Sequence, residues 1–169
     1  MFKPMQSILF ATDLSENCLH ALETSMLLAK EHNASIILLH VTSKNVPEFI
    51  EADIRSMLGE EKWKAINEKH KQESREALIG KMTSSTILEK VRKQFCEDLG
   101  LEEENMGLDW QDIVVADKHV ASAILAQAKE NKCDLIVLGV GRGFWGDNSV
   151  GSTIKGVMQH TDIPVMLVP

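Results

Sequence analysis

The residues with the clearest capacity for chemistry lie between Gly139 and Thr153, near the end of this sequence. Four glycines fall there within eight residues, at positions 139, 141, 143 and 146, and the segment ends in Gly151-Ser152-Thr153. Glycine lets the backbone approach a ligand without a Cβ in the way. A helix that opens at Gly151 would turn its free N–H groups and its dipole toward an anion. We therefore predict a phosphate site, to which the Ser152 and Thr153 hydroxyls can donate hydrogen bonds.

Two familiar phosphate-binding patterns do not fit this segment. A P-loop needs a lysine directly after a suitably spaced glycine, and none is present. A GxGxxG pattern fails because Phe144 stands where the third glycine would follow Gly139 and Gly141. Arg142 either adds positive charge to the site or points into solvent. The glycines alone therefore leave a second interpretation open, a surface loop whose Ser and Thr only cap a helix.

Two further loops could complete such a site, because ligands of open parallel sheets bind beyond the carboxyl ends of the strands. Ala11-Thr12-Asp13 ends the first predicted strand, and His40-Val41-Thr42 ends the second. Asp13 is either a ligand-binding acid or a turn former and helix cap, and its place after a central strand favours the ligand role. His40 is predicted to be structural, and the other histidines show no metal-ligand spacing. No Ser-His-Asp triad and no pair of carboxylates can be argued from the sequence.

Five short apolar runs predict the strands that position these loops. Segments with helical spacing of apolar residues separate them, and this alternation predicts a doubly wound parallel sheet. The strands are expected at Ser7–Ala11, Ser35–Val41, Trp110–Val115, Asp134–Gly139 and Ile163–Val168. Helices are expected at 16–32, 118–131 and Gly151–His160, with Ser15 as the N-cap and Asn33 as the left-handed end of the first.

The stretch from 45 to 100 is predicted to be a long crossover of two or more helices. It is polar and rich in Glu and Lys, a composition typical of a solvated helix face. Near its end, one apolar face carries Leu88, Val91, Phe95 and Leu99, and Gly100 ends the helix. The stretch could cover the mouth of the site or extend a partner surface, and the sequence does not decide between these roles.

Bulk composition excludes several classes of protein. The 169 residues suffice for one domain with a proper core. The net charge of −7 opposes binding to a nucleic-acid backbone, although a few backbone N–H groups can still hold a small phosphate. No apolar run approaches the roughly 18–20 residues of a membrane span, and the N-terminus does not resemble a signal peptide. The three cysteines form neither a disulfide framework nor a CxxC site, so a reducing cytoplasm fits best.

Several of these features together resemble the universal stress proteins. Ala11-Thr12-Asp13-Leu14-Ser15 is similar to the end of the family's first strand, and His40-Val41 to the end of its second. The family's nucleotide loop has the pattern G-x2-G-x9-G-[ST], and Gly141, nine intervening residues, Gly151 and Ser152 fit its second half. The tail from Gln159 to Val168 resembles the closing helix and strand. The resemblance spans nearly the whole chain and is weakest over 45–110.

The first half of the nucleotide loop departs from the family pattern. Gly139-Val140-Gly141 is one residue shorter than G-x2-G, so the turn that faces the phosphates is either shifted or reshaped. Trp145 adds a bulky ring, and Asp147 adds an acid that would repel phosphate unless a cation intervenes or the side chain points away. Because the family contains ATP-binding and non-binding members, these changes bear on function.

The resemblance implies a fold and a set of site residues. The fold is a single domain over 1–169 with a five-stranded, mostly parallel sheet in the order 3-2-1-4-5, of the adenine nucleotide alpha hydrolase-like type. Thr12 and Asp13 would lie by the adenosine, with Asp13 near the ribose or a nucleotide-bound Mg²⁺ or Mn²⁺, and Val41 would offer backbone groups to adenine. The remaining residues that would line the nucleotide are Ala11, Gly139, Gly141, Arg142, Gly151, Ser152 and Thr153.

Three functions are compatible with these expectations. The favoured one is a binding module for ATP, ADP or AMP that signals through conformation or assembly. The second is a family member that has lost nucleotide binding and acts through dimerisation or partner contacts. The third is a slow ATPase or phosphotransferase, slow because no general base is evident. The resemblance also implies a homodimer through Ile163–Val168, an apolar strand whose edge would otherwise invite pairing.

Overall fold

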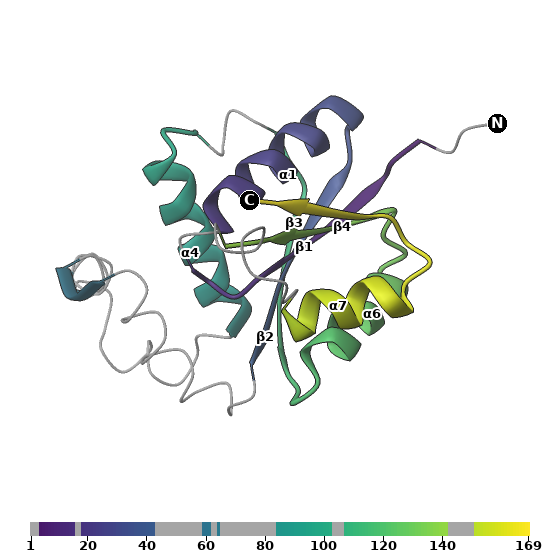
Figure 1. Cartoon of the computed structure of the whole chain (residues 1–169). Helices are drawn as coiled ribbons and strands as arrows, with labels where there is room; N and C mark the ends of the chain where they lie inside the picture. Colours follow the sequence, from purple (N-terminus) through teal and green to yellow (C-terminus); the bar gives the residue numbers. More distant parts are fainter. Residues whose placement is uncertain are drawn as a thin grey trace.

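A sheet of five strands forms the centre of the computed structural model (Figure 1). In sheet order the strands are β3 (Trp110–Ala116), β2 (Ser35–Thr42), β1 (Ser7–Thr12), β4 (Leu135–Gly139) and β5 (Val165–Val168). Every neighbouring pair is parallel. The predicted fold class and the predicted strand order are therefore confirmed.

The structure describes residues 4–15, 18–42, 59–61, 64, 84–102, 107–141 and 151–169. Of the predicted crossover at 45–100, it describes helix α4 (Ser84–Asp98) and a few residues near 60. Most of the glycine-rich loop, including Arg142, Trp145 and Asp147, lies outside the described residues. Within the described ranges, no helix combines the length and apolar character needed to cross a membrane.

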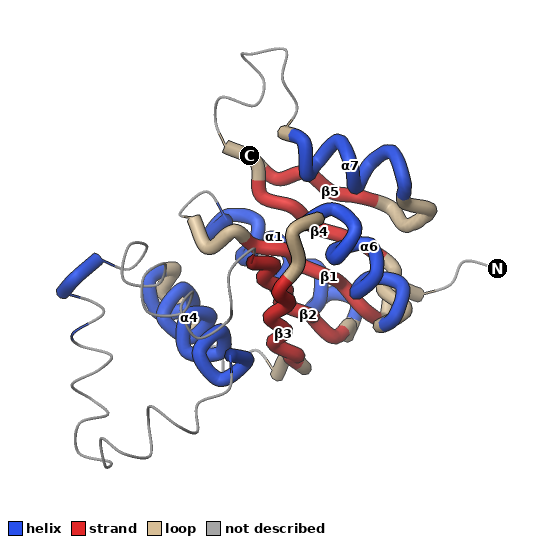
Figure 2. The backbone as a smooth tube through the Cα atoms, turned by 90° about the horizontal axis from the view of Figure 1, so that it is seen from below, coloured by secondary structure: helices blue, strands red, loops and turns tan. Residues whose placement is uncertain are grey.

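Helices cover both faces of the sheet (Figures 1 and 2). Helices α1 (Leu19–His32) and α4 pack on one face, where the β1 side chains of Ile8 and Phe10 are buried. Helices α6 (Val120–Glu130) and α7 (Ser152–His160) pack on the other face, against Leu9 of the same strand. Alternate residues of a strand point to opposite faces, so a strand covered on both sides must be apolar throughout. This is the reason for the unbroken apolar runs in the sequence.

The helix ends agree with the predictions in two places and differ in one. Asn33 ends α1 with φ 52°, and Gly100 follows α4 with φ 68°, both in the left-handed region. The prediction of Ser15 as an N-cap is wrong, because α1 begins at Leu19 after Cys18. The side chains of Thr12 and Asp13 take up nearby backbone N–H groups, and Leu14 adopts φ 66°. The chain therefore makes a separate turn before it enters the helix.

Helix α4 is held against the edge strand β3 by a buried ion pair. Arg92 donates from Nε and Nη2 to the two carboxylate oxygens of Asp112, each at 3.1 Å. Its guanidinium also lies 4.4 Å from the ring centroid of Trp110, two residues earlier on the same strand. Both charged side chains are almost fully buried, with 4% and 9% of their surface exposed. The pair, together with the apolar face around Val91 and Phe95, attaches this helix to the sheet.

Helix α7 lies close against α6 because Gly156 has no side chain. A Cβ added at Gly156 would stand 2.8 Å from Cβ of Ala121, closer than two carbon atoms can pack. The two helices therefore approach through a glycine and an alanine, and Val157 is fully buried beside them. This contact sets the position of α7, whose first turn carries Ser152 and Thr153.

Candidate functional site

The carboxyl ends of the four strands β3, β2, β1 and β4 meet at one edge of the sheet, in a register that aligns the predicted site residues. Thr12 pairs with His40, and Thr42 pairs with Ala116 on the far side of β2. On the other side of β1, Ala11 pairs with Leu138, so Thr12 and Gly139 follow at the same level. Strand order reverses between β1 and β4, and such a switch point is where open sheets bind ligands.

The turn after β1 presents Asp13 at this edge. Its carboxylate oxygen Oδ1 accepts a hydrogen bond from the N–H of Ser15 at 2.9 Å and one from the thiol of Cys18 at 3.2 Å. The hydroxyl of Thr12 accepts the N–H of Leu14 at 2.9 Å. Thr12 and Leu14 are buried, whereas Asp13 is exposed. The described part of the turn thus has a buried base and one charged group, Asp13, that reaches solvent.

The local contacts hold Asp13 in its ionised form. Burial of its inner part alone would raise the pKa of Asp13, but hydrogen bonds from the hydroxyl and N–H of Ser15 and from Cys18 lower it, and the net result is a lowered pKa. Cys18 shows the opposite behaviour. Burial raises the pKa of its thiol, a hydrogen bond with Thr12 opposes this, and the charge of Asp13 raises it further. At neutral pH the pair is therefore a carboxylate that accepts and a thiol that donates.

Val41 lies near the end of β2, half-buried and next to the switch point. Backbone groups alternate along this strand: the N–H of Ser35 bonds to Gln6 before β1, and that of Ile36 bonds to Asp109 before β3. By this alternation the N–H and C=O of Val41 face β1. The last residue of β1 that pairs with β2 is Thr12, which pairs with His40, so the carbonyl of Val41 lies past the paired part of these two strands.

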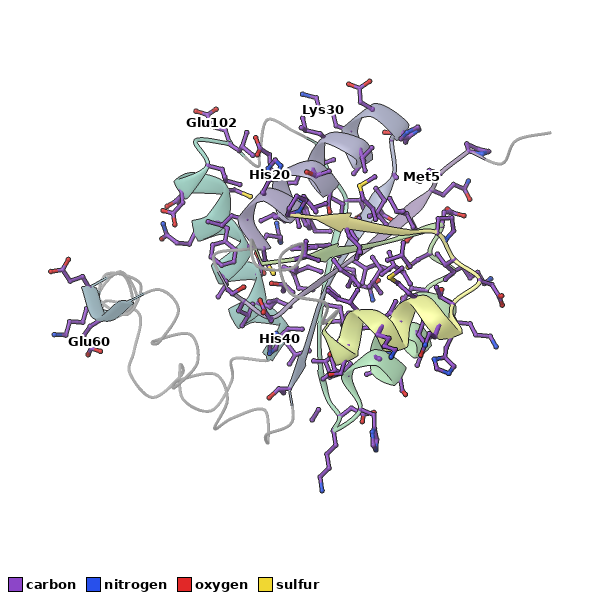
Figure 3. All side chains as sticks on the ribbon, in the orientation of Figure 1. Met5, His20, Lys30, His40, Glu60 and Glu102 are labelled. Atoms are coloured by element: carbon purple, nitrogen blue, oxygen red, sulfur yellow. The ribbon has the colours of Figure 1, made fainter. Side chains whose placement is uncertain are left out.

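His40 connects the ends of β1 and β2 (Figure 3). Its Nδ1 donates to the carbonyl of Thr12 at 2.8 Å, and the side chain is buried. This contact agrees with the structural role predicted for His40. It also stiffens the strand end from which Asp13 projects.

The glycines at positions 139 and 141 differ in their relation to β4. Gly139 is still part of the strand and pairs with Val168 of β5. The N–H of Val140, the next residue, donates to the carbonyl of Val168 at 2.8 Å. Gly141 is half-buried and is the last described residue before the loop. The first glycine of the predicted phosphate segment is therefore used by the sheet, and Gly141 is the one that lies beyond the ladder.

The first turn of α7 is the helix start at which the sequence predicts an anion site. The N-cap is Gly151, and no side chain among the described residues caps the helix. The N–H groups of the first turn have no partners within the helix. A Cβ built on Gly151 would meet no atom within 4 Å, which leaves room for a ligand beside the backbone. Ser152 is exposed and Thr153 is half-buried, and the start of α7 lies at the same end of the sheet as the chain's C-terminus (Figure 2).

The structure brings together most, not all, of the predicted residues. Thr12, Asp13, Val41, Gly139 and Gly141 lie at the aligned strand ends, and α7 starts at the same edge. Ala11 is buried inside β1 and offers only backbone there. Arg142 lies outside the described residues.

Two residues at this edge were missed by sequence reasoning. Cys18 contacts Asp13, but a cysteine in an apolar helical pattern gives no sign of such a contact. Asp117 follows β3 as Asp13 follows β1, and its Oδ1 accepts the N–H of His119 at 2.8 Å. The signal for Asp117 was present in the sequence, an aspartate directly after an apolar strand.

The described residues include no group of three His, Cys, Asp or Glu side chains that could hold a metal ion. An uncapped helix start, open space at Gly151 and an exposed carboxylate together fit a phosphorylated ligand with hydroxyl groups.

Comparison with known proteins identifies the family. The model of the universal stress protein family matches residues 4–169. The chain belongs to the universal stress protein family. No curated relative matches the sequence significantly.

Solved structures of universal stress proteins share the fold. One in complex with cAMP has a TM-score of 0.57 and 18% identity, and the alignment covers 98% of each chain. One from Burkholderia pseudomallei has a TM-score of 0.57 and 19% identity, with 100% of this chain and 99% of that chain covered. One from Archaeoglobus fulgidus in complex with dAMP has a TM-score of 0.53 and 15% identity, with 99% and 100% covered. The architecture of a universal stress protein is thus retained at low sequence identity.

Proposed function

We propose that this universal stress protein binds an adenine nucleotide at the carboxyl edge of its sheet and acts as a binding module. Asp13 would accept hydrogen bonds from the ribose or contact a divalent ion held by the phosphates. The carbonyl of Val41 would face the adenine, and Thr12 and Ala11 would form the floor. The backbone near Gly139 and Gly141, with Gly151, Ser152, Thr153 and Arg142, would surround the phosphates. ATP, ADP and AMP are all candidates, the first with Mg²⁺ or Mn²⁺.

One observation carries this proposal: the uncapped start of α7 and the exposed Asp13 lie at the same edge, on the two sides of the switch point. The helix start attracts negative charge, and the carboxylate accepts hydroxyl groups. A phosphorylated sugar needs both at once. The relatives solved with cAMP and dAMP show that members of the family take such ligands. They share under a fifth of their residues with this chain, so the residue roles rest on the geometry described above.

Calorimetric titration with ATP, AMP and cAMP, each with and without Mg²⁺, tests the proposal. Gly151→Val is a sharp variant, since φ −51° and ψ 141° suit any residue and an added Cβ meets no atom. It should leave the unfolding temperature unchanged and weaken nucleotide binding about tenfold or more, because a side chain would stand where phosphate approaches.

Asp13→Asn should also weaken binding, by about tenfold, the effect of weakening hydrogen bonds to a charged group. Asp117→Asn is its matched control, because Asp117 makes the same turn contact at the end of β3. If neither Gly151→Val nor Asp13→Asn alters the affinity more than Asp117→Asn does, the nucleotide binds elsewhere. If the wild-type protein binds none of the three nucleotides, the proposal fails.

One observation favours the alternative, a universal stress protein that binds no nucleotide. Gly139 is held in the ladder with Val168, so of the glycines at 139 and 141 only Gly141 lies beyond the strand. Such a turn offers less backbone to phosphate. The titration above distinguishes the two functions directly.

We further propose a homodimer through the C-terminal strand, in a cytoplasmic protein. In the described part of the sheet, β5 has a neighbour on one side only, β4. The carbonyls of Pro164 and Val168 bond to β4, so by alternation the N–H groups of Val165 and Leu167 point to the open edge. An apolar strand with such an edge is stabilised when a second copy covers it. The three cysteines are free and buried, in agreement with a reducing compartment.

Sedimentation of two matched variants tests the dimer. Leu167→Pro removes an outward N–H group and leaves the ladder to β4 intact, whereas Leu167→Ala removes a similar amount of side chain and keeps that N–H. The proline variant should be monomeric at micromolar concentration and the alanine variant dimeric. A monomeric wild-type protein would refute the proposed dimer, and the nucleotide proposal would be unaffected.

A further inference from the structure

In the turn between β1 and α1, the thiol of Cys18 contacts the carboxylate of Asp13. This contact is not part of the family's nucleotide-loop pattern. The sulfur of Cys18 lies 3.2 Å from Oδ1 of Asp13 and 3.9 Å from the hydroxyl of Ser15. The side chains of Asp13 and Ser15 thus both approach a single buried thiol, of which 4% of the surface is exposed.

The hydrogen bonds of this turn form an ordered series. The Ser15 hydroxyl donates to the sulfur of Cys18. The thiol hydrogen then remains for Asp13, which as a carboxylate can only accept. Each group thus donates or accepts as its chemistry allows, and the series of hydrogen bonds ends on the exposed carboxylate of Asp13.

We propose that Cys18 is a positioning residue, whose thiol holds the Asp13 carboxylate in the orientation that receives the nucleotide. This inference rests on the proposed nucleotide function. Two donors, the N–H of Ser15 and the thiol, converge on the same oxygen. The Ser15 donors belong to the turn itself, whereas the thiol reaches the carboxylate from Cys18, directly before α1, and restricts its rotation about the last torsion.

Three variants of Cys18 and one control test the role. Cys18→Ser keeps a donor at this position, Cys18→Ala removes it, and Cys18→Val removes it while filling more of the space. Cys133→Ala is the control, since Cys133 is also buried and also contacts a hydroxyl, that of Ser7 at 3.6 Å, but at the opposite end of the sheet. The carboxyl carbon resonance of Asp13 and the amide resonance of Ser15, in protein without nucleotide, report the contact itself. Titration with ATP and Mg²⁺ reports its consequence.

The expected pattern separates a positioning role from a packing role. Cys18→Ala and Cys18→Val should shift both resonances and weaken nucleotide binding about tenfold, as expected for a lost hydrogen bond to a charged group. Cys18→Ser should return the Asp13 resonance toward its wild-type position. It should also return the affinity to within about threefold of the wild-type value, a smaller change than loss of the hydrogen bond causes. Cys133→Ala should change neither reading, although it too removes a buried thiol.

Two results would overturn the inference. One is an Asp13 resonance that does not move in Cys18→Ala, which would show that the thiol does not hold the carboxylate. The other is an affinity that falls equally in Cys18→Ser, Cys18→Ala and Cys133→Ala, which would reflect packing alone. If the wild-type protein binds no nucleotide, the proposed function fails, and the resonances still decide whether Cys18 holds Asp13.

Discussion

The contact between α4 and β3 and the turn between β1 and α1 each hold an aspartate, and they hold it in opposite ways. The Asp112 side chain is 9% exposed and has both oxygens bonded to Arg92. Asp13 is exposed, and its donors converge on one oxygen. Burial raises the pKa of Asp112 more than Arg92 lowers it, whereas the turn donors lower the pKa of Asp13 despite its partial burial.

The difference separates a carboxylate committed to structure from one available to a ligand. A buried carboxylate needs all its hydrogen bonds from the protein, because no water reaches it. An exposed carboxylate that is kept ionised and oriented can still accept further hydrogen bonds. The comparison therefore predicts that changes at Arg92 and Asp112 act on stability, and that changes around Asp13 act on binding.

The largest effect is expected from Arg92→Met. It leaves Asp112 buried without its partner and should lower the free energy of unfolding by about 3–5 kcal/mol, measured by urea denaturation. Adding Asp112→Leu should recover most of this loss, because no uncompensated charge then remains. The neighbouring Lys93→Met is the control: Lys93 and Glu89 form an exposed pair, at 2.8 Å, that contributes at most about 1 kcal/mol. Equal losses in Arg92→Met and Lys93→Met would contradict the structural role of the buried pair.

An intermediate effect is expected at Leu14, which anchors the turn below Asp13. The side chain is buried, with 3% exposed, and its backbone is left-handed at φ 66°. Leu14→Ala should cost about 2–5 kcal/mol, because it empties the core position and keeps a conformation that disfavours Cβ. Leu14→Gly should be no less stable than Leu14→Ala, since glycine removes that conformational cost of about 1–2 kcal/mol.

Leu22, buried in the middle of α1, provides the contrast for this prediction. There the glycine variant should be less stable than the alanine variant by about 1 kcal/mol, the usual helix preference. Thermal unfolding of the four variants checks both orders. If glycine is the less stable substitution at both positions, the left-handed turn is not maintained in solution.

The smallest effect is a difference in pH dependence between Asp13→Asn and Asp112→Asn. The pKa of Asp13 lies below its ordinary value of 3.8, so its contribution to stability is full above that pH and is lost as the pH falls through the folded-state pKa. The pKa of Asp112 lies above 3.8, so its contribution is full below that pH and is lost as the pH rises through the folded-state pKa.

Urea denaturation at pH values on both sides of 3.8, the ordinary pKa of an aspartate, measures this difference. The stability of the wild-type protein relative to Asp13→Asn should increase with pH, and relative to Asp112→Asn it should decrease. Slopes of the same sign would mean that the two environments do not differ as the structure indicates.

The fold was predictable from the sequence because its signals are local. Each covered strand is an apolar run, each helix has its own spacing, and Asn33 and Gly100 mark helix ends through their backbone preferences. The candidate site was predictable in outline for a related reason. Its loops follow strands, and parallel strands bring their carboxyl ends to one edge, so Asp13, Val41 and Gly139 lie at that edge whatever contacts they make there.

The contacts themselves depend on tertiary structure. Nothing in the spacing of Arg92 and Asp112 indicates that one helix and one strand will bury them together. The pairing of Gly139 with Val168 takes a glycine out of the predicted loop, and only the β4–β5 register shows it. The same holds for Cys18 and Asp13, five residues apart, which meet because Leu14 turns the chain into a left-handed conformation before α1 begins. Apolar periodicity reports which residues must leave water, whereas the partner that each polar group finds there depends on how the elements pack, which no single segment contains.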